Sequence, residues 1–361
     1  MRGTRTFLSA LVLGLGLACA GEGGLPGITP EPEPVPDPEP APAPAPVVPV
    51  RQQVQRVDTR VGTLERSALL HLPDGHHTEK MPMIVLLHGE DSDARRFANV
   101  ASPWFDRGVV FLFPSGKPGH EPEDESKTGK HKRQDPQPDE EIELGESWKD
   151  PGDRAYVEVV VDQVVRAHDI DPAQVFVAGL GDGGRIVLEL ACAESSSKTF
   201  AGYAPVGASL ERTAAAECQA PGFPKPMLVI AGTDDEITLW TGDKLHLSVS
   251  ETADLFGKKD ECDPASQKEG LLEDTDGSDE TRVKRHSWTC EGEPVELLEI
   301  SGGGHTWPHP GLRAPPKTSR DIDALAEIVD MFGVPVDGTP APSTPTPTDG
   351  KAGKRGKRRG G

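Results

Sequence analysis

The stretch "QVFVAGLGDGGRIVLELACA", residues 174–193, decides the fold. Its first seven residues are mostly apolar, as is typical of a strand buried on both faces of a sheet. Its end, "RIVLELACA", places apolar side chains at the three- and four-residue spacing of an amphipathic helix. The four glycines within "GLGDGG", residues 179–184, predict a tight turn between the two. The stretch therefore predicts a strand, a turn and a helix of an α/β protein.

Apolar strand patterns and helical periodicity alternate along the rest of the chain. The expected strands are 66–73, 81–89, 108–116, 174–180, 200–209, 226–233 and 295–303, and the expected helices are 93–102, 153–168, 183–193, 248–259 and 319–333. Uniformly apolar strands that alternate with helices indicate a mostly parallel sheet covered by helices on both faces. We therefore expect one α/β domain.

Composition places this domain at residues 52–335. The chain has 361 residues, of which 36 are Pro and 40 are Gly. Prolines are concentrated in 20–51 and 336–361, which bury too little apolar surface to offset the entropy of ordering; we expect a linker and a Pro/Thr-rich, basic tail there. The charged stretch 117–147 has no periodicity and is expected to be a surface insertion, and 262–290 is a second departure from the alternation.

Residues 1–19 have the pattern of an export signal. Arg2 and Arg5 precede an apolar run that is too short to span a bilayer and that ends at Cys19. The segment "GLGLAC" resembles a bacterial lipoprotein cleavage site, although Gly16 stands where that family usually has Leu. The resemblance implies a lipid on Cys19 and attachment to the bacterial cell envelope, at the outer membrane; the alternative is a plain secretory signal and an extracellular protein.

Cysteine usage agrees with export. Without Cys19, four of the five cysteines remain, an even number that suits disulfides in an oxidising compartment. Three pairings are possible, and we expect Cys192 with Cys218 and Cys262 with Cys290, because each pair closes a moderate loop between neighbouring elements. No CxxC or paired-His spacing accompanies them, so we expect no metal and no cofactor.

Charge restricts the class of partner. The net charge of −21 argues against a nucleic acid, whose phosphates most of the surface would repel. The C-terminal "KAGKRGKRRGG", residues 351–361, is basic and rich in glycine, which suits a flexible arm on an anionic surface. The alternative is a solvated tail without a specific partner.

Four polar stretches follow expected strands, where the functional groups of a parallel α/β sheet collect. They are "LLHGE" (86–90), "GLGDGG" (179–184), "AGTDDEIT" (231–238) and "SGGGHTWP" (301–308). A glycine turn, an acid and a histidine in this order match the chain order of an α/β-hydrolase triad.

With their order and spacing, these stretches resemble the secreted polyhydroxybutyrate depolymerases and the feruloyl or acetylxylan esterases. The resemblance runs from about Val61 to Phe332; it includes "FPSG", Trp148 and "FAGYAPVGAS", and "GGGHTWP" is its most specific piece. It implies an α/β-hydrolase fold and, as ligand, an ester-bearing polymer or a small acyl or sugar ester.

The resemblance also assigns roles to residues. Asp235 matches the triad acid, with Asp234 beside it as an alternative, and His305 matches the general base. The backbone N–H groups of Glu90 and Asp182 match the two donors of the oxyanion hole. Taken alone, the acid and the histidine would be interpreted as structural residues.

The family's nucleophilic serine falls on Gly181, which has no side chain. Losing such a nucleophile costs on the order of 10⁶-fold in turnover. Three substitutes can be considered: Asp182 as a carboxylate nucleophile, His305 activating water directly, or a remote serine such as Ser115 or Ser147. We expect none of them to act.

The neighbouring residues also depart from the family. Asp182, Arg185 and Glu236 replace its usual Asn, Met and Pro, so the site has changed as a group. We therefore expect a pseudoenzyme that binds or scaffolds, and we expect Gly181→Ser to restore hydrolysis. One alternative is a carboxylic ester hydrolase, and another is a structural surface lipoprotein. His88 is expected to pack beneath the oxyanion loop.

Overall fold

A computed structural model gives the fold of the chain. It describes residues 53–74, 79–90, 92–118, 146–218, 224–312 and 315–336. The expected export signal with Cys19, the linker, the tail and most of the charged insertion lie outside the described residues.

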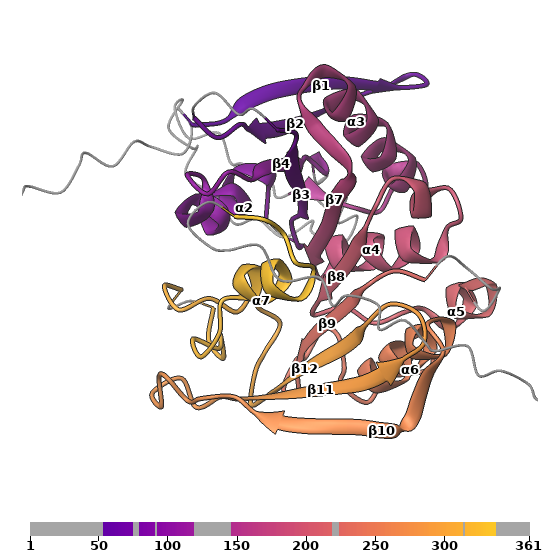
Figure 1. Cartoon of the computed structure of the whole chain (residues 1–361), viewed down its shortest axis with the longest axis vertical. Coiled ribbons are helices and arrows are strands. Elements are labelled where there is room, and N and C mark those ends of the chain that lie inside the picture. The colour runs from indigo at the N-terminus through magenta and orange to yellow at the C-terminus, as the bar shows by residue number, and fades with distance from the viewer. Residues whose placement is uncertain are drawn as a thin grey trace, which may run out of the picture. The chain divides into compact units, whose positions relative to one another are not determined.

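A ten-stranded sheet forms the centre of the described domain (Figure 1). The strands run in the order β1-β2-β4-β3-β7-β8-β9-β12-β11-β10. Their bounds are β1 (Gln55–Val61), β2 (Leu64–His71), β3 (Met81–Leu87), β4 (Val110–Pro114), β7 (Ile170–Leu180), β8 (Gly202–Val206), β9 (Met227–Gly232), β10 (Cys262–Leu271), β11 (Arg282–Cys290) and β12 (Val295–Ser301).

The middle of the sheet is parallel and both of its ends are antiparallel. Strands β4, β3, β7, β8, β9 and β12 pair in parallel, in that order. At one end β2 pairs antiparallel with β4 and with β1, and at the other β11 pairs antiparallel with β12 and with β10. This mixed sheet, with helices on both faces, is the α/β-hydrolase fold, and it confirms the predicted fold class.

Helices cover the two faces of the sheet. Figure 1 shows α3, α4 and α6 on one side and α2 and α7 on the other. Their bounds, with that of the short α5, are α2 (Ala94–Ala101), α3 (Asp153–Ala167), α4 (Asp182–Cys192), α5 (Arg212–Cys218), α6 (Val249–Lys259) and α7 (Ala324–Met331). The first group shares one hydrophobic cluster with the sheet, and the second group shares another.

Strand β3 shows why the sheet is buried on both faces. Successive side chains of a strand point to opposite faces. Met83, Val85 and Leu87 join the cluster beneath α3 and α4, while Ile84 and Leu86 join the cluster beneath α2 and α7. All five side chains are almost completely buried, so a continuous apolar run, without alternating polar residues, is what this strand requires.

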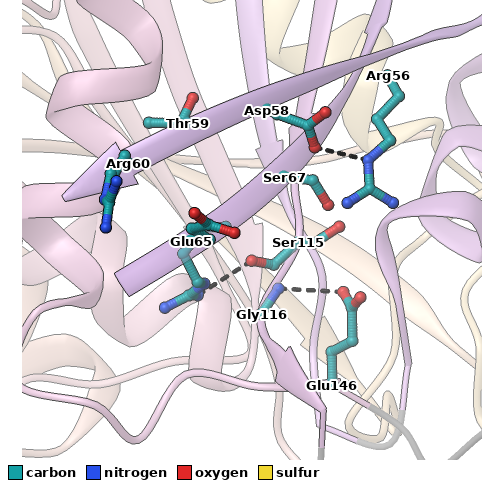
Figure 2. Close-up of a pocket in the computed structure, with 10 residues that line it drawn as sticks. Arg56, Asp58, Thr59, Arg60, Glu65, Ser67, Ser115, Gly116 and Glu146 are labelled. Carbon is teal, nitrogen blue, oxygen red and sulfur yellow. Dashed lines mark hydrogen bonds and ion pairs between the residues drawn. The ribbon is translucent and has the colours of Figure 1, made fainter. Parts of the chain in front are cut away.

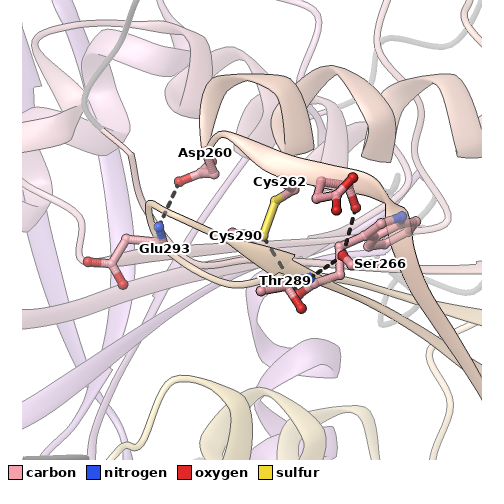
Figure 3. Close-up of a disulfide and its surroundings, with 8 residues drawn as sticks. Asp260, Cys262, Ser266, Thr289, Cys290 and Glu293 are labelled. Atoms are coloured by element: carbon pink, nitrogen blue, oxygen red, sulfur yellow. Dashed lines mark hydrogen bonds between the residues drawn. A yellow bond between two sulfur atoms is a disulfide. The ribbon is translucent and has the colours of Figure 1, made fainter. Parts of the chain in front are cut away.

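The second departure from the alternation, 262–290, contains β10 and β11. These strands form an antiparallel hairpin in which Cys262 pairs directly with Cys290, and a disulfide joins the two (Figure 3). Strand β10 is polar and mostly exposed, which explains why apolar periodicity did not predict it. A second disulfide links Cys192, at the end of α4, to Cys218 in α5. Both disulfides are the pairs expected from the sequence.

The two ends of the charged insertion lie side by side in a short antiparallel pairing. Lys117 pairs with Ser147 in the short antiparallel sheet of β5 (Lys117–Pro118) and β6 (Glu146–Ser147). Within the described ranges, no helix is both long and apolar enough to cross a membrane.

Candidate active site

The glycine turn between β7 and α4 forms the centre of the site. Gly181 lies there with φ 54° and ψ −118°, a backbone conformation that L-residues adopt only under constraint. Such a strained strand-to-helix turn is the nucleophile elbow of α/β-hydrolases. Gly183 allows the turn to pack closely, because a Cβ there would lie 2.5 Å from the carbonyl oxygen of His88.

The expected acid and histidine meet at this elbow. Asp235 follows β9, and its Oδ1 accepts the backbone N–H groups of Ile237 and Thr238. Its Oδ2 lies 2.9 Å from Nδ1 of His305, which follows β12. A Cβ at Gly181 would lie only 2.6 Å from Nε2 of the same imidazole. The fold therefore brings the three triad positions together.

Asp234 does not share this contact. Its carboxylate is half exposed and lies 3.3 Å from Nζ of Lys317, on the surface. The side chain of Asp235 is fully buried beside His305. Geometry therefore favours Asp235 over Asp234 as the partner of the histidine.

The side chain of Glu90 fills the space in front of the elbow. Its Oε1 accepts the backbone N–H of Asp182 at 3.0 Å, and its Oε2 lies 3.2 Å from Nε2 of His305. A Cβ built on Gly181 would overlap Oε2. The carboxylate thus occupies the space that a side chain at position 181 would fill, and it accepts one of the two N–H groups expected as oxyanion donors.

Sequence reasoning assigned Glu90 only a backbone role and missed its side chain. The signal was present, because an acid directly follows "LLHG" in the loop that faces the elbow. What the sequence did not reveal was that a glycine at 181 leaves room for this carboxylate.

The two carboxylates raise the pKa of His305. Burial by itself lowers this pKa, but hydrogen bonds to Asp235 and to Glu90, together with their charges, outweigh burial and raise it from 6.5 to about 9. The imidazole is therefore protonated at neutral pH, with an N–H directed at each carboxylate. A triad histidine must be neutral in order to accept a proton, so this arrangement opposes general-base catalysis.

The pKa values of Glu90 and Asp182 are shifted in opposite directions. Burial raises the pKa of Glu90, but the hydrogen bonds and charge of His305 and the amide donors lower it below the usual 4.5. Burial and the negative charge of Glu90 raise the pKa of Asp182. Glu90 therefore carries the negative charge that faces the histidine.

A cavity of about 210 Å³ opens beside the elbow. Its lining includes Glu90, Gly181, Ile237, Leu239 and the buried Ser209, which the sequence analysis did not single out.

Ser115 and Ser147 do not line this cavity. Ser115 lies instead on a larger cavity of about 700 Å³ beside β1 and β2, together with three arginines and three acidic residues. Figure 2 shows this second cavity, where an N–H of the buried Arg66 side chain donates to the Ser115 carbonyl oxygen. The two serines are thus not positioned as substitute nucleophiles.

His88 supports the loop that carries Glu90. It is fully buried, its Nε2 accepts the Gly116 N–H at 3.0 Å, and its carbonyl oxygen accepts Nε1–H of Trp148 at 2.9 Å.

In the part of the chain that the structure describes, no group of three or more His, Cys, Asp or Glu residues is arranged to hold a metal ion.

The fold is that of the α/β-hydrolases, and the known proteins to which the chain is similar include esterases and a depolymerase. No protein-family model matches the chain. Over 168 residues it is 28% identical to NocK of Nocardia uniformis subsp. tsuyamanensis, whose name assigns it provisionally to the esterases; the match covers 42% of this chain and 48% of NocK. Over 284 residues it is 25% identical to poly(3-hydroxyalkanoate) depolymerase C of Paucimonas lemoignei, covering 73% of this chain and 63% of the relative.

The chain thus spans about half to two thirds of the length of these two relatives. Among solved structures, acetyl xylan esterase from Aspergillus awamori is similar with a TM-score of 0.49 and 13% identity, over 74% of this chain and 94% of that one.

Proposed function

We propose that this chain is an exported, esterase-like α/β-hydrolase that has lost hydrolysis and binds or scaffolds instead. The observation that carries the proposal is the Glu90 carboxylate in the space that a side chain at position 181 would fill. Acyl transfer needs an Oγ within reach of a neutral imidazole, and a free oxyanion hole. Here the elbow has no side chain, the imidazole is protonated, and the Asp182 N–H is already bonded.

The ligand that this proposal favours is an ester-bearing polymer or a small acyl or sugar ester. The name of the depolymerase relative supports an ester polymer.

Export and a lipid on Cys19 are further parts of the proposal, supported by the N-terminal sequence pattern. Labelling of the wild-type chain, but not of a Cys19→Ser variant, with a radioactive fatty acid in a bacterial host is the expected result; equal labelling would contradict the lipid.

Hydrolysis of p-nitrophenyl butyrate tests the loss of activity. We expect no turnover by the wild-type chain. We also expect none from Gly181→Ser alone, contrary to the expectation from the sequence, because the new Cβ meets Glu90 and His305. The double variant Gly181→Ser/Glu90→Ala frees the space and keeps the backbone N–H of residue 90, so it should gain turnover.

The matched control is a triple variant that adds His305→Ala to this pair and should abolish the gain. Robust wild-type turnover that is lost in His305→Ala would refute the proposal. That result would support the second candidate, a carboxylic ester hydrolase, which the retained contact between Asp235 and His305 favours. A parallel Ser209→Ala variant would then show whether the buried serine of the cavity supplies the nucleophile.

A further inference from the structure

We infer that the elbow site is a receptor for short-chain carboxylate anions, and that Glu90 is a tethered ligand that competes for it. The inference rests on the proposed loss of hydrolysis and goes beyond the proposed function, because it assigns to the elbow site a ligand class other than the ester that the resemblance implies. That class is an acid anion, which differs from the neutral ester that a hydrolase binds.

The donors around Glu90 form a carboxylate-binding set. One oxygen receives the Asp182 N–H at the start of α4, and the other faces Nε2 of His305. Two donors that address the two oxygens of one carboxylate bind it directionally, and a protonated donor makes the bond stronger than a neutral one. The Asp182 N–H also belongs to the first turn of an eleven-residue helix, whose end favours negative charge.

The imidazole of His305 has a carboxylate partner on each side. His305 carries a positive charge between Asp235 and Glu90, and Arg185 lies beside Asp182 at 3.9 Å. Without the Glu90 carboxylate, one side of the imidazolium loses its partner. An external carboxylate would restore the charge and both hydrogen bonds, whereas a neutral ester or amide would restore no charge.

The cavity beside this donor set is suited to a hydrocarbon tail. Its volume is about 210 Å³; Ala208, Ile237 and Leu239 contribute apolar wall, and polar and charged side chains that include Arg185, Asp243 and His246 line the rest. Ile237 is 63% exposed and Leu239 is 43% exposed, so both present apolar surface to solvent beside the elbow. A short alkyl chain lying on these residues would cover them while its carboxylate meets the donors.

Glu90 can leave the site more readily than the other charged partner of His305. Its side chain is 29% exposed, whereas that of Asp235 is fully buried and fixed by two backbone N–H groups. A tethered ligand acts at an effective concentration in the millimolar range or above, so a free acid competes poorly with it. Removal of the Glu90 carboxylate should therefore increase the affinity for external carboxylates.

Calorimetric titration with sodium butyrate tests this inference on the full chain. We expect Glu90→Ala to bind butyrate at least tenfold more tightly than wild type, and not to bind the neutral isostere butyramide measurably. Glu90→Gln is the matched control, because its neutral amide still fills the site; its butyrate affinity should stay well below that of Glu90→Ala. Adding His305→Asn to Glu90→Ala should abolish the binding.

Two results would overturn the inference: butyrate binding by Glu90→Ala no tighter than by wild type, or equal binding of butyrate and butyramide. If Glu90→Ala does not fold, two other measurements remain. Glu90→Gly also removes the carboxylate, and in wild type the His305 Hε1 resonance should shift at saturating butyrate. The titration contains no ester. Hydrolysis by wild type would therefore refute the proposed loss of activity separately, and absent butyrate binding would refute only this inference.

Discussion

The charge on His305 should make folding stability depend on pH in a range where few side chains titrate. Its Nδ1 lies 2.9 Å from Asp235 and its Nε2 lies 3.2 Å from Glu90, and the side chain is 13% exposed. These contacts raise its pKa from 6.5 to about 9. Since one unit of pKa shift corresponds to about 1.4 kcal/mol, protonated His305 contributes roughly 3 kcal/mol to the free energy of unfolding.

The direction of the pKa shift decides at which pH this contribution to stability is lost. Because the folded-state pKa lies above the unfolded one, the contribution is complete below pH 6.5, declines between pH 6.5 and 9, and is absent at higher pH. Urea unfolding of wild type across this range should therefore show a loss of roughly 3 kcal/mol. Glu90→Gln removes one of the two negative charges that face the imidazole. The free energy of unfolding of this variant should therefore fall clearly less over the same pH range.

Comparing the two proteins removes the contribution of groups that they share. Asp260, for example, has a pKa raised to about 6 by burial and titrates in both. The His305 Hε1 resonance gives the pKa directly. A midpoint near 6.5 in wild type, or the same pH dependence of unfolding in wild type and Glu90→Gln, would refute the assignment of an imidazolium between two carboxylates.

Three further substitutions test the fold. Gly181→Ala should lower the free energy of unfolding by on the order of 3 kcal/mol, because it adds a Cβ at positive φ in an occupied space; unchanged urea unfolding would show that the site relaxes freely. Asp153→Ala leaves the guanidinium of Arg66 buried without its 2.8 Å ion pair and should cost about 3 to 5 kcal/mol, whereas a loss below about 1 kcal/mol would mean that water replaces the carboxylate. The double variant Cys262→Ser/Cys290→Ser opens a loop with a sequence separation of 28 and should lower the thermal midpoint, by roughly 3 to 4 kcal/mol in stability; an unchanged midpoint would show that strand pairing alone holds the hairpin.

The central fold could be predicted because its strands are apolar on both faces. The expected strand 81–89 contains β3, and the expected helix 153–168 contains α3 almost unchanged. Strands β1, β10 and β11 were not predicted: β1 and β10 lie at the edges of the sheet, β11 lies beside β10, and all three carry many polar residues. Apolar periodicity reports burial, and edge strands are held mainly by backbone hydrogen bonds that any sequence can form.

The candidate site could be predicted in its positions but not in its contacts. Chain order placed Asp235, His305 and Gly181 together because the carboxyl ends of parallel strands meet at one edge. The direction of the Glu90 side chain depends on the empty volume at the elbow and on two donors from distant segments. Only the assembled fold brings these together.

The carboxylate at the elbow also has an evolutionary consequence. If an ancestor had serine at position 181, a return by that single replacement would meet the Glu90 side chain and a histidine that holds its proton. A return that begins at Glu90 passes through a protein in which His305 keeps only Asp235 as its partner and in which residue 181 offers no nucleophile. Neither intermediate has a serine nucleophile beside a neutral imidazole, so on the proposed function no single replacement at these two positions restores hydrolysis.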